Sequence, residues 1–190
     1  RNGVLARHEL NLYFTAEQIP LDEELRKAVP RTVQKAWQEL EPRGSADLEA
    51  HVRYRTGDDR PNIQVKIQPR VESASIRPTF FPYLIEGLSG SIDYDEGKIT
   101  LSKLHGHHGN TTIRTNGDGF FGPQGDWQFQ LVGLSADRVI ANRDLILALP
   151  EGLRKVIDQL HPYGDFNLHE GWFHFSRGAS PLAPLQANWD

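Results

Sequence analysis

The densest group of side chains that could support chemistry is a run of three histidines, His105, His107 and His108. If the chain is extended here, His105 and His107 lie on one face of a strand, where both could bind a zinc ion. The neighbouring glycines Gly106 and Gly109 favour a turn instead, and no convincing third ligand is close in the sequence. We expect a solvated loop at this point. The three histidines are the candidate metal ligands if the chain is a metal-dependent enzyme.

Other residue types that catalyse reactions lack the patterns that catalysis needs. Two carboxylate pairs, Asp93 with Asp95 and Asp58 with Asp59, fall in strand or turn contexts, where a solvated charge is the usual role. No serine occupies a nucleophile elbow, and the sequence contains no cysteine. We therefore predict that the chain is not an enzyme, has no catalytic residue and needs no cofactor.

A glycine-rich stretch at 116–119 is followed by two phenylalanines, a glycine and a proline at 120–123. It has neither the spacing of a phosphate-binding Walker loop nor that of an EF-hand calcium loop. We predict a hairpin loop here and no bound ion.

The composition excludes several classes of partner. Lys and Arg number 21 and Asp and Glu 25, which gives a net charge of −4, so we expect no surface for nucleic acid. No apolar run approaches the ~20 residues of a membrane-spanning helix. The 190 residues suffice for one domain with a substantial core. Because the chain starts at Arg1 and contains no methionine, we expect a piece of a longer polypeptide, with any membrane contact outside this piece.

The middle of the chain, from about 45 to 134, alternates apolar and polar residues with turn residues between short runs. Ile63, Val65 and Ile67 alternate with polar residues, as in a strand with one buried and one solvated face. The pattern predicts an antiparallel sheet with one apolar face. Its strands are expected around 62–68, in a hairpin at 92–101 with a turn at 95–97, and at 111–115 and 127–131.

Two helical segments, at about 20–41 and 140–161, flank this sheet. In each, a proline (Pro30 or Pro150) separates two short helices, because proline suits the first turn of a helix but not its interior. The second helix of each pair is predicted to bury one face. Its apolar residues at i, i+3, i+4 and i+7 are Val33, Ala36, Trp37 and Leu40 in the first segment and Leu153, Val156, Ile157 and Leu160 in the second.

The two helical segments lie within a predicted internal repeat with an offset of 120 residues. Leu10 to Tyr54 aligns without a gap with Gln130 to His174, and nine aligned pairs are identical, against about three expected by chance. We predict an α+β fold: a curved antiparallel sheet flanked by short helical crossover segments, with this partial repeat. The identical pairs are Ala16/Ala136, Leu25/Leu145, Ala28/Ala148, Pro30/Pro150, Lys35/Lys155, Leu40/Leu160, Pro42/Pro162, Gly44/Gly164 and Leu48/Leu168.

Several segments resemble the repeating unit of AsmA-like proteins. In that family a proline-containing segment leads into strands with a nonpolar-x-Gly-x-nonpolar pattern, a tight turn, and a strand that ends before a glycine. Here Phe81 to Tyr94, Gly97 to Leu101, and then Leu104 and the stretch 106–109 follow this order. Ala148 to Gly164 resembles the crossover between the β-groove repeats of the family.

The resemblance implies a periplasmic location in the cell envelope of a bacterium with two membranes. The parent protein would be anchored to the inner membrane outside these residues, and its sheets would form an apolar trough that passes phospholipids between membranes. Residues 1–190 would be one β-groove unit and part of the next. The implied partners are lipid acyl chains and neighbouring repeats of the same chain. The family has no catalytic residue to transfer.

The apolar sheet positions are the candidates for lining such a groove. Sliding acyl chains need a continuous apolar surface without strong point contacts, because each buried CH₂ contributes ~0.8 kcal/mol. The alternative is a structural or protein-interaction repeat, in which the same residues form a closed core without a ligand. The candidates are Ile63, Val65, Ile67, Ile92, Tyr94, Ile99, Leu101, Ile113, Trp127, Phe129 and Leu131.

Overall fold

The computed structural model describes residues 8–180 and 183–189. These residues form one antiparallel sheet of ten strands and four short helices. The strands are β1 (Glu9–Pro20), β2 (Ser45–Arg55), β3 (Asn62–Pro69), β4 (Ser75–Ile76), β5 (Ile85–Asp95), β6 (Lys98–His108), β7 (Thr111–Phe121), β8 (Trp127–Ile140), β9 (Asp165–Arg177) and β10 (Gln186–Trp189). The helices are α1 (Glu23–Ala28), α2 (Arg31–Leu40), α3 (Arg143–Ala148) and α4 (Glu151–Leu160).

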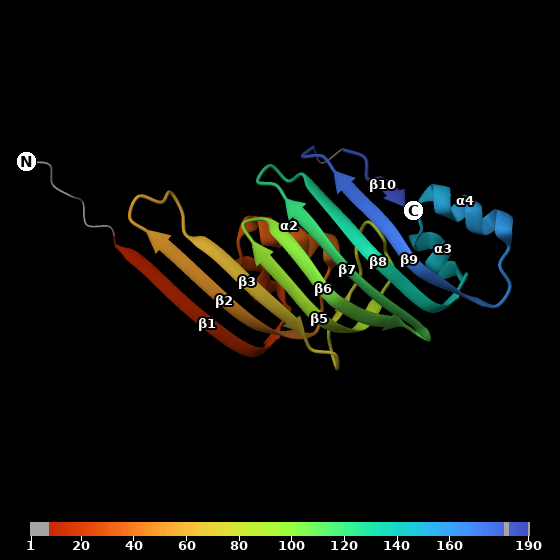
Figure 1. Cartoon of the computed structure of the whole chain (residues 1–190), viewed down its shortest axis with the longest axis horizontal. Coiled ribbons are helices and arrows are strands. Elements are labelled where there is room, and N and C mark those ends of the chain that lie inside the picture. The colour runs from red at the N-terminus through yellow and green to blue at the C-terminus, as the bar shows by residue number, and fades with distance from the viewer. Residues whose placement is uncertain (1–7, 181–182, 190) are drawn as a thin grey trace, which may run out of the picture.

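The sheet is open and curved, and its strands follow the order of the chain. The order is β1-β2-β3-β5-β6-β7-β8-β9-β10, with β4 paired to β5. β1 lies at one end of the molecule, and β10 lies with α3 and α4 at the other (Figure 1). The predicted α+β class and antiparallel sheet are therefore confirmed. The sheet extends beyond the predicted range of 45–134, because β1 and β9 also belong to it.

Each helix pair joins two neighbouring antiparallel strands. α1 and α2 connect β1 to β2, and α3 and α4 connect β8 to β9. The segments are therefore insertions between adjacent strands, and the prediction of crossovers is wrong in this respect. A crossover is needed only where the connected strands are parallel or separated in the sheet.

Side chains and backbone geometry explain where these helices start and stop. Asp22 accepts hydrogen bonds from the backbone of Glu24 and Leu25, which caps α1. α2 follows Pro30 directly, because the fixed φ of proline suits a helix start. α2 ends at Glu41, whose backbone is left-handed with φ 45°. The proline at position 42 cannot continue a helix, so the chain turns into β2.

The alternating sequence gives the sheet one apolar and one polar face. Because side chains alternate along a strand, each cross-strand row belongs to one face. One row runs through Phe14, Ala50, Val65, Tyr94 and Ile99. The adjacent row, on the opposite face, runs through Thr15, Glu49, Lys66, Asp93 and Thr100.

Two predicted turns can be compared with the structure. The hairpin at 95–97 is present, since β5 and β6 are joined through Glu96 and Gly97, with φ of 47° and 94°. The hairpin loop predicted over 116–123 is wrong for 116–119, because this stretch lies inside β7, but the turn that joins β7 to β8 does follow at Gly122 to Asp126. Gly119 pairs with Phe129 there, and a Cβ atom at Gly119 would lie 2.4 Å from the Phe129 ring. The glycine makes room for an aromatic ring on the next strand.

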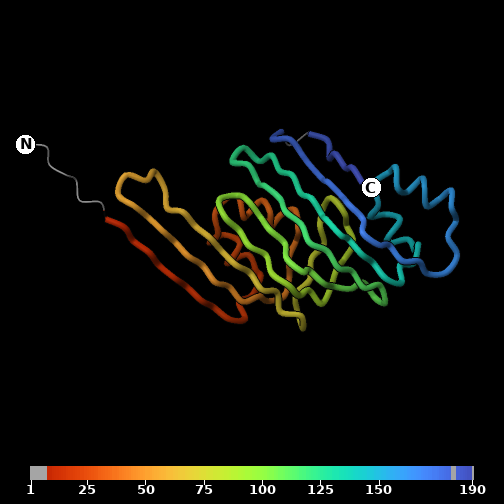
Figure 2. The backbone as a smooth tube through the Cα atoms, in the orientation of Figure 1, coloured from red at the N-terminus to blue at the C-terminus, as the bar shows by residue number. Residues whose placement is uncertain are grey.

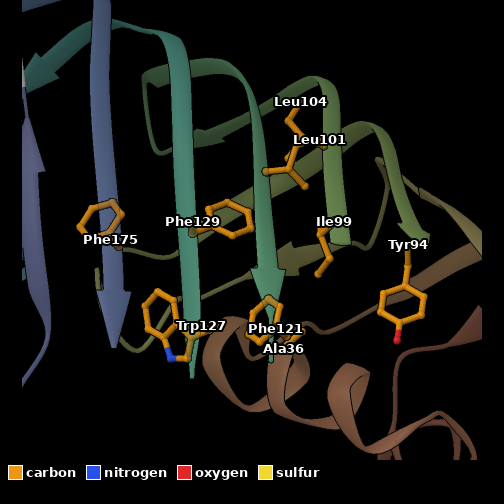
Figure 3. Packing of buried hydrophobic residues seen from close by; sticks show 9 residues of the cluster. All are labelled: Ala36, Tyr94, Ile99, Leu101, Leu104, Phe121, Trp127, Phe129 and Phe175. Carbon is orange, nitrogen blue, oxygen red and sulfur yellow. The ribbon is translucent and has the colours of Figure 1, made fainter. Parts of the chain in front are cut away.

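The apolar face holds the core of the molecule. The larger buried cluster spans β5 to β9 and includes Ala36 of α2 beneath Phe121 and Trp127 (Figure 3). A smaller cluster joins Tyr83 to the face of β8 and to α3. Both clusters lie on the side of the sheet where α2 crosses its middle (Figure 1). The apolar face is therefore covered in the middle by a helix.

Candidate functional site

The apolar face carries a cavity of about 300 Å³, which we call the apolar groove. Its floor is formed by strands β5 to β9, and its sides by helices and by the segment 77–84. None of the described residues that line it is Asp, Glu, Lys or Arg. The groove volume is at the lower end of the range for small-molecule sites. Such a lining can hold hydrocarbon, but it offers no charged group to bind a metal or a polar substrate.

The segment 77–84, which we call the strap, crosses the apolar face between β4 and β5. The backbone N–H groups of Arg77 and Thr79 donate to the carbonyls of Leu40 and Glu39, at 3.0 and 2.8 Å, so the strap is fixed to the end of α2. Figure 2 shows it on the same side of the sheet as the first helix pair. The strap therefore closes part of the face and leaves the groove beside it.

Phe80 anchors the strap to the sheet. Its ring centroid lies 5.2 Å from that of Trp127, 6.4 Å from that of Phe129 and 4.9 Å from that of Phe175. These tilted pairs are the arrangement that aromatic quadrupoles favour. The strap is held from both sides, by α2 through its backbone and by β8 and β9 through this ring.

The second helix pair forms the opposite wall. Leu145 and Ala148 of α3 are buried against Tyr83, Ala136 and Val139. Further along, α3 and α4 contribute Leu145, Leu149, Leu153 and Ile157 to the groove.

Tyr83 is the buried polar group at this wall. Burial raises the pKa of its phenol, which a hydrogen bond with Thr111 partly offsets and the charge of Asp144 raises further. The Tyr83 ring stacks on His108 at 4.0 Å, and His108 Nδ1 donates to the Leu84 carbonyl at 2.8 Å. Because the phenol stays protonated at neutral pH, it serves as a hydrogen-bonding group and not as a base.

The predicted lining residues all belong to the apolar face by strand register or burial, but they do not all reach the groove. Ile92, Leu101, Ile113, Phe129 and Leu131 line it. Tyr94, Ile99 and Trp127 are buried in the cluster under α2, and Val65 packs against that cluster. Ile63 and Ile67 are half-buried on β3, towards the β1 end.

Sequence reasoning missed more of the lining than it found. The apolar residues of the strap follow neither a helical nor a strand period, so the sequence pattern did not indicate that they are buried. The residues of β9 lie after the second helical segment, beyond the range 45–134 in which alternation predicted the sheet. The helical residues Leu153 and Ile157 were recognised as an apolar face, but not as a wall of the groove. The missed residues include Pro78, Phe80, Phe81, Tyr83, Ile85, Leu104, Phe166, Leu168, Phe173 and Phe175.

The three histidines do not form a cluster in a loop, so that expectation is wrong. All three lie in β6, because Gly106 makes room for the side chain of Ile85 and does not form a turn. His105 and His107 are exposed, whereas His108 contacts Tyr83. Among the described residues, no group of three or more His, Asp or Glu side chains is arranged to hold a metal ion.

A second, larger hollow of about 520 Å³ lies over β1, β2, β3, β5 and β6. Its lining mixes charged residues such as Lys66, Asp93 and Asp95 with aromatic and apolar ones. Asp95 accepts hydrogen bonds there from Asn62 and Gln64. Asp93 accepts a hydrogen bond from Ser91 at 3.3 Å. Both carboxylates are thus engaged in hydrogen bonds, and the almost wholly apolar groove is the more specific candidate.

No helix within the described ranges, 8–180 and 183–189, is long and apolar enough to cross a bilayer. Comparison with known proteins found no matching protein family, no matching curated protein and no matching solved structure.

Proposed function

We propose that the apolar groove binds hydrocarbon chains of lipids and that the protein carries or conducts them without catalysing a reaction. The groove is the observation that carries the proposal: a cavity of about 300 Å³ with an almost wholly apolar lining on a sheet whose other face is polar. A sealed core would leave no such cavity, since protein interiors are close-packed.

The physical chemistry of the lining suits a mobile chain. Each CH₂ group transferred from water into the groove contributes ~0.8 kcal/mol, wherever along the groove it lies. Directional polar contacts would hold a ligand at one place, and the groove offers few of them. The polar headgroup of a lipid would stay outside, in water, because burying it without partners is costly.

We also infer an internal repeat with a 120-residue offset. Supporting it, α1 and α3 start and end at positions 120 apart, and so do α2 and α4. The pairing of Ala16 with Leu48 corresponds to that of Ala136 with Leu168. Such agreement is expected of duplicated units, because helix punctuation alone does not determine strand register.

Backbone details support the same repeat. Gln18 and Arg138 have φ of 55° and 56° at a bulge in β1 and β8. The N–H of each donates to a side chain on the next strand, to Asp47 at 2.9 Å and to Asn167 at 2.8 Å. The correspondence stops between Leu134 and Ala136, because β8 carries register shifts at Leu131/Leu134 and Leu134/Ala136 that β1 lacks. The repeat is thus shorter than the aligned segment Leu10–Tyr54.

The AsmA-like resemblance extends this proposal to the parent protein. We propose that residues 1–190 are one β-groove unit and part of the next, in an envelope protein of the periplasm anchored to the inner membrane elsewhere in its sequence. The groove, the one-sided sheet and the repeat support this assignment. Lipids and neighbouring repeats are then the partners.

A pair of substitutions on β8 tests lipid binding. Leu134 lines the groove, whereas Val132 is 43% exposed next to Leu131 and so lies on the other face. We expect the chain to bind a pyrene-labelled fatty acid, followed by fluorescence titration. Leu134→Asn should weaken binding at least ~10-fold, because a lost apolar contact and a buried amide together cost more than ~1.4 kcal/mol. Val132→Asn is the matched control and should bind like the wild type.

The proposal fails if the wild-type chain does not bind the probe, or if both variants lose binding equally. Circular dichroism and the urea midpoint of each variant show whether the fold is intact.

The alternative is a structural or protein-interaction repeat without a ligand. Its supporting observation is the strap, which together with α2 already covers part of the apolar face. In that case mass spectrometry of the protein purified from cells would detect no lipid.

A further inference from the structure

Two apolar surfaces at opposite ends of the molecule are exposed and are not covered by any described helix or strand. On α4, Val156 is 46% and Leu160 69% exposed. On β1, Leu10 is 51% and Phe14 54% exposed, and both lie on the apolar face of the sheet. Isolated exposed apolar residues are common, but contiguous groups of them mark interaction surfaces.

The chain itself contains an interface of the kind that would cover both. α2 leaves the sheet after β1 and lies across the apolar face of the strands that follow β2. There Ala36 is 5% exposed against Phe121 and Trp127, and the hydroxyls of Thr32 and Tyr94 are 2.7 Å apart. The helix buries its apolar stripe on the sheet, and the sheet buries its apolar face under the helix.

α4 has the corresponding stripe but only part of the corresponding sheet. Val156 and Leu160 occupy the positions that Ala36 and Leu40 occupy in α2, 120 residues earlier. α4 starts next to β10, because a Cβ atom at Gly152 would lie 2.8 Å from the Trp189 ring. β10 has four residues and is the last strand of the described sheet. Leu153 and Ile157 of the stripe line the groove, whereas Val156 and Leu160 are the part of it that the described residues leave exposed.

The two surfaces cannot cover each other within one molecule. β1 and α4 lie at opposite ends of the long axis (Figure 1). Between two molecules they are complementary in kind, since one is an apolar helix stripe and the other an apolar sheet face. β1 and β10 are the edge strands of the sheet that the described residues form.

We propose that a second copy of this chain docks head to tail, with α4 of one copy covering the apolar face of β1 and β2 of the next. The contact is heterologous, because it joins two different surfaces, and it can therefore repeat into an open series. It would place the apolar faces of successive copies side by side. The interface does not depend on whether the groove binds lipid.

Complementary variants test the proposal directly. The double variant Val156→Glu/Leu160→Glu blocks the α4 surface, and Phe14→Glu blocks the β1 surface. Gln159→Glu on the polar side of α4 and Thr15→Glu on the polar face of β1 are the controls at exposed positions. Thr15→Glu adds the same charge as Phe14→Glu, and Gln159→Glu adds one of the two negative charges of the α4 double variant. Sedimentation velocity over a range of protein concentrations measures association.

Wild type and both controls should increase in mass with concentration. Each blocked variant alone should remain monomeric, with an association constant at least ~10-fold weaker. An equimolar mixture of the two blocked variants should form a species of two chains and nothing larger, because each variant keeps one intact surface.

The proposal is overturned if the wild-type chain stays monomeric, if either blocked variant still assembles alone, or if the mixture does not form the two-chain species. A wild-type monomer would favour a neighbouring unit of the same polypeptide as the covering element. Assembly of the α4 variant alone would show a symmetric contact through β1. The urea midpoints of all variants are compared, so that unfolding is not mistaken for lost association.

Discussion

Asp47 holds β1 and β2 together where β1 bulges. Its carboxylate accepts a hydrogen bond from the Gln18 N–H at 2.9 Å and one from Arg70 Nε at 2.8 Å. The backbone hydrogen bond from Gln18 is the main cause of a lowered pKa of Asp47, and Arg70 lowers it further. Asn167 in β9, 120 residues later, accepts a hydrogen bond from the Arg138 N–H in the same way, but with an uncharged side chain. The hydrogen bond to Asp47 thus depends on the charge of its carboxylate, whereas the hydrogen bond to Asn167 does not.

A lowered pKa makes this contact sensitive to acid. Because the pKa of Asp47 is lower in the folded than in the unfolded state, its contribution is complete above the unfolded value of ~3.9 and is lost as the pH falls towards the folded value. We expect Asp47→Asn to reduce the loss of unfolding free energy between pH 7 and pH 3. Urea unfolding at several pH values measures this. Equal acid sensitivity in both proteins would show that Asp47 does not contribute.

Single residues also show where sequence reasoning failed. Gly117 and Gly119 suggested a loop because glycine is common in turns, but both lie in β7 next to Leu131 and Phe129. Gly106 gave the same false signal in β6. Periodicity cannot reveal that a glycine serves a bulky neighbour on another strand, since that neighbour is known only from the register. Large residues at alternate positions of the following strand were the available clue.

At the scale of elements, strands and helices followed from local patterns, while their arrangement over the apolar face did not. The alternation at 62–68 and the proline at position 30 located β3 and α2 closely. The strap could not be predicted, because its position depends on Phe80 meeting rings from β8 and β9. The groove beside it was therefore identified only through residues of its floor.

The helices α2 and α4 have the same length and should nevertheless differ in their response to a glutamate on the apolar side. Ala36, the sixth residue of α2, is 5% exposed under the sheet, whereas Val156, the sixth residue of α4, is 46% exposed. We expect Ala36→Glu to lower the unfolding free energy by about 3 kcal/mol or more, because it buries an unpaired charge. Val156→Glu should change it by less than ~0.5 kcal/mol at protein concentrations where the chain is monomeric. Urea unfolding at low concentration measures both.

Similar effects of the two variants would contradict the difference in cover between these helices. If Val156→Glu were as damaging as Ala36→Glu, α4 would have to be packed in solution against an element of the same molecule. That result would also remove the free surface on which the head-to-tail contact depends.

At the scale of the whole molecule, the core is unevenly distributed along the sheet. Both buried clusters take their strand residues from β5 to β9, and neither contains a residue of β1 or β2. Among the described strands, β1 pairs only with β2. The end of the sheet at β1 thus has backbone hydrogen bonds but little burial to support them, and such regions open at lower free energy than the core.

Amide hydrogen exchange should reveal this gradient. We expect amides in the β1–β2 ladder to exchange at least ~10-fold faster than those in the β6–β7 and β7–β8 ladders, because separating β1 from β2 exposes little additional apolar surface. The measurement needs the Phe14→Glu variant, or a dilute sample, since head-to-tail docking would protect β1. Uniform protection in the monomer would mean that the whole sheet opens as one unit. Protection of β1 that rises with wild-type concentration, but not in the variant, would instead be the exchange signature of the proposed contact.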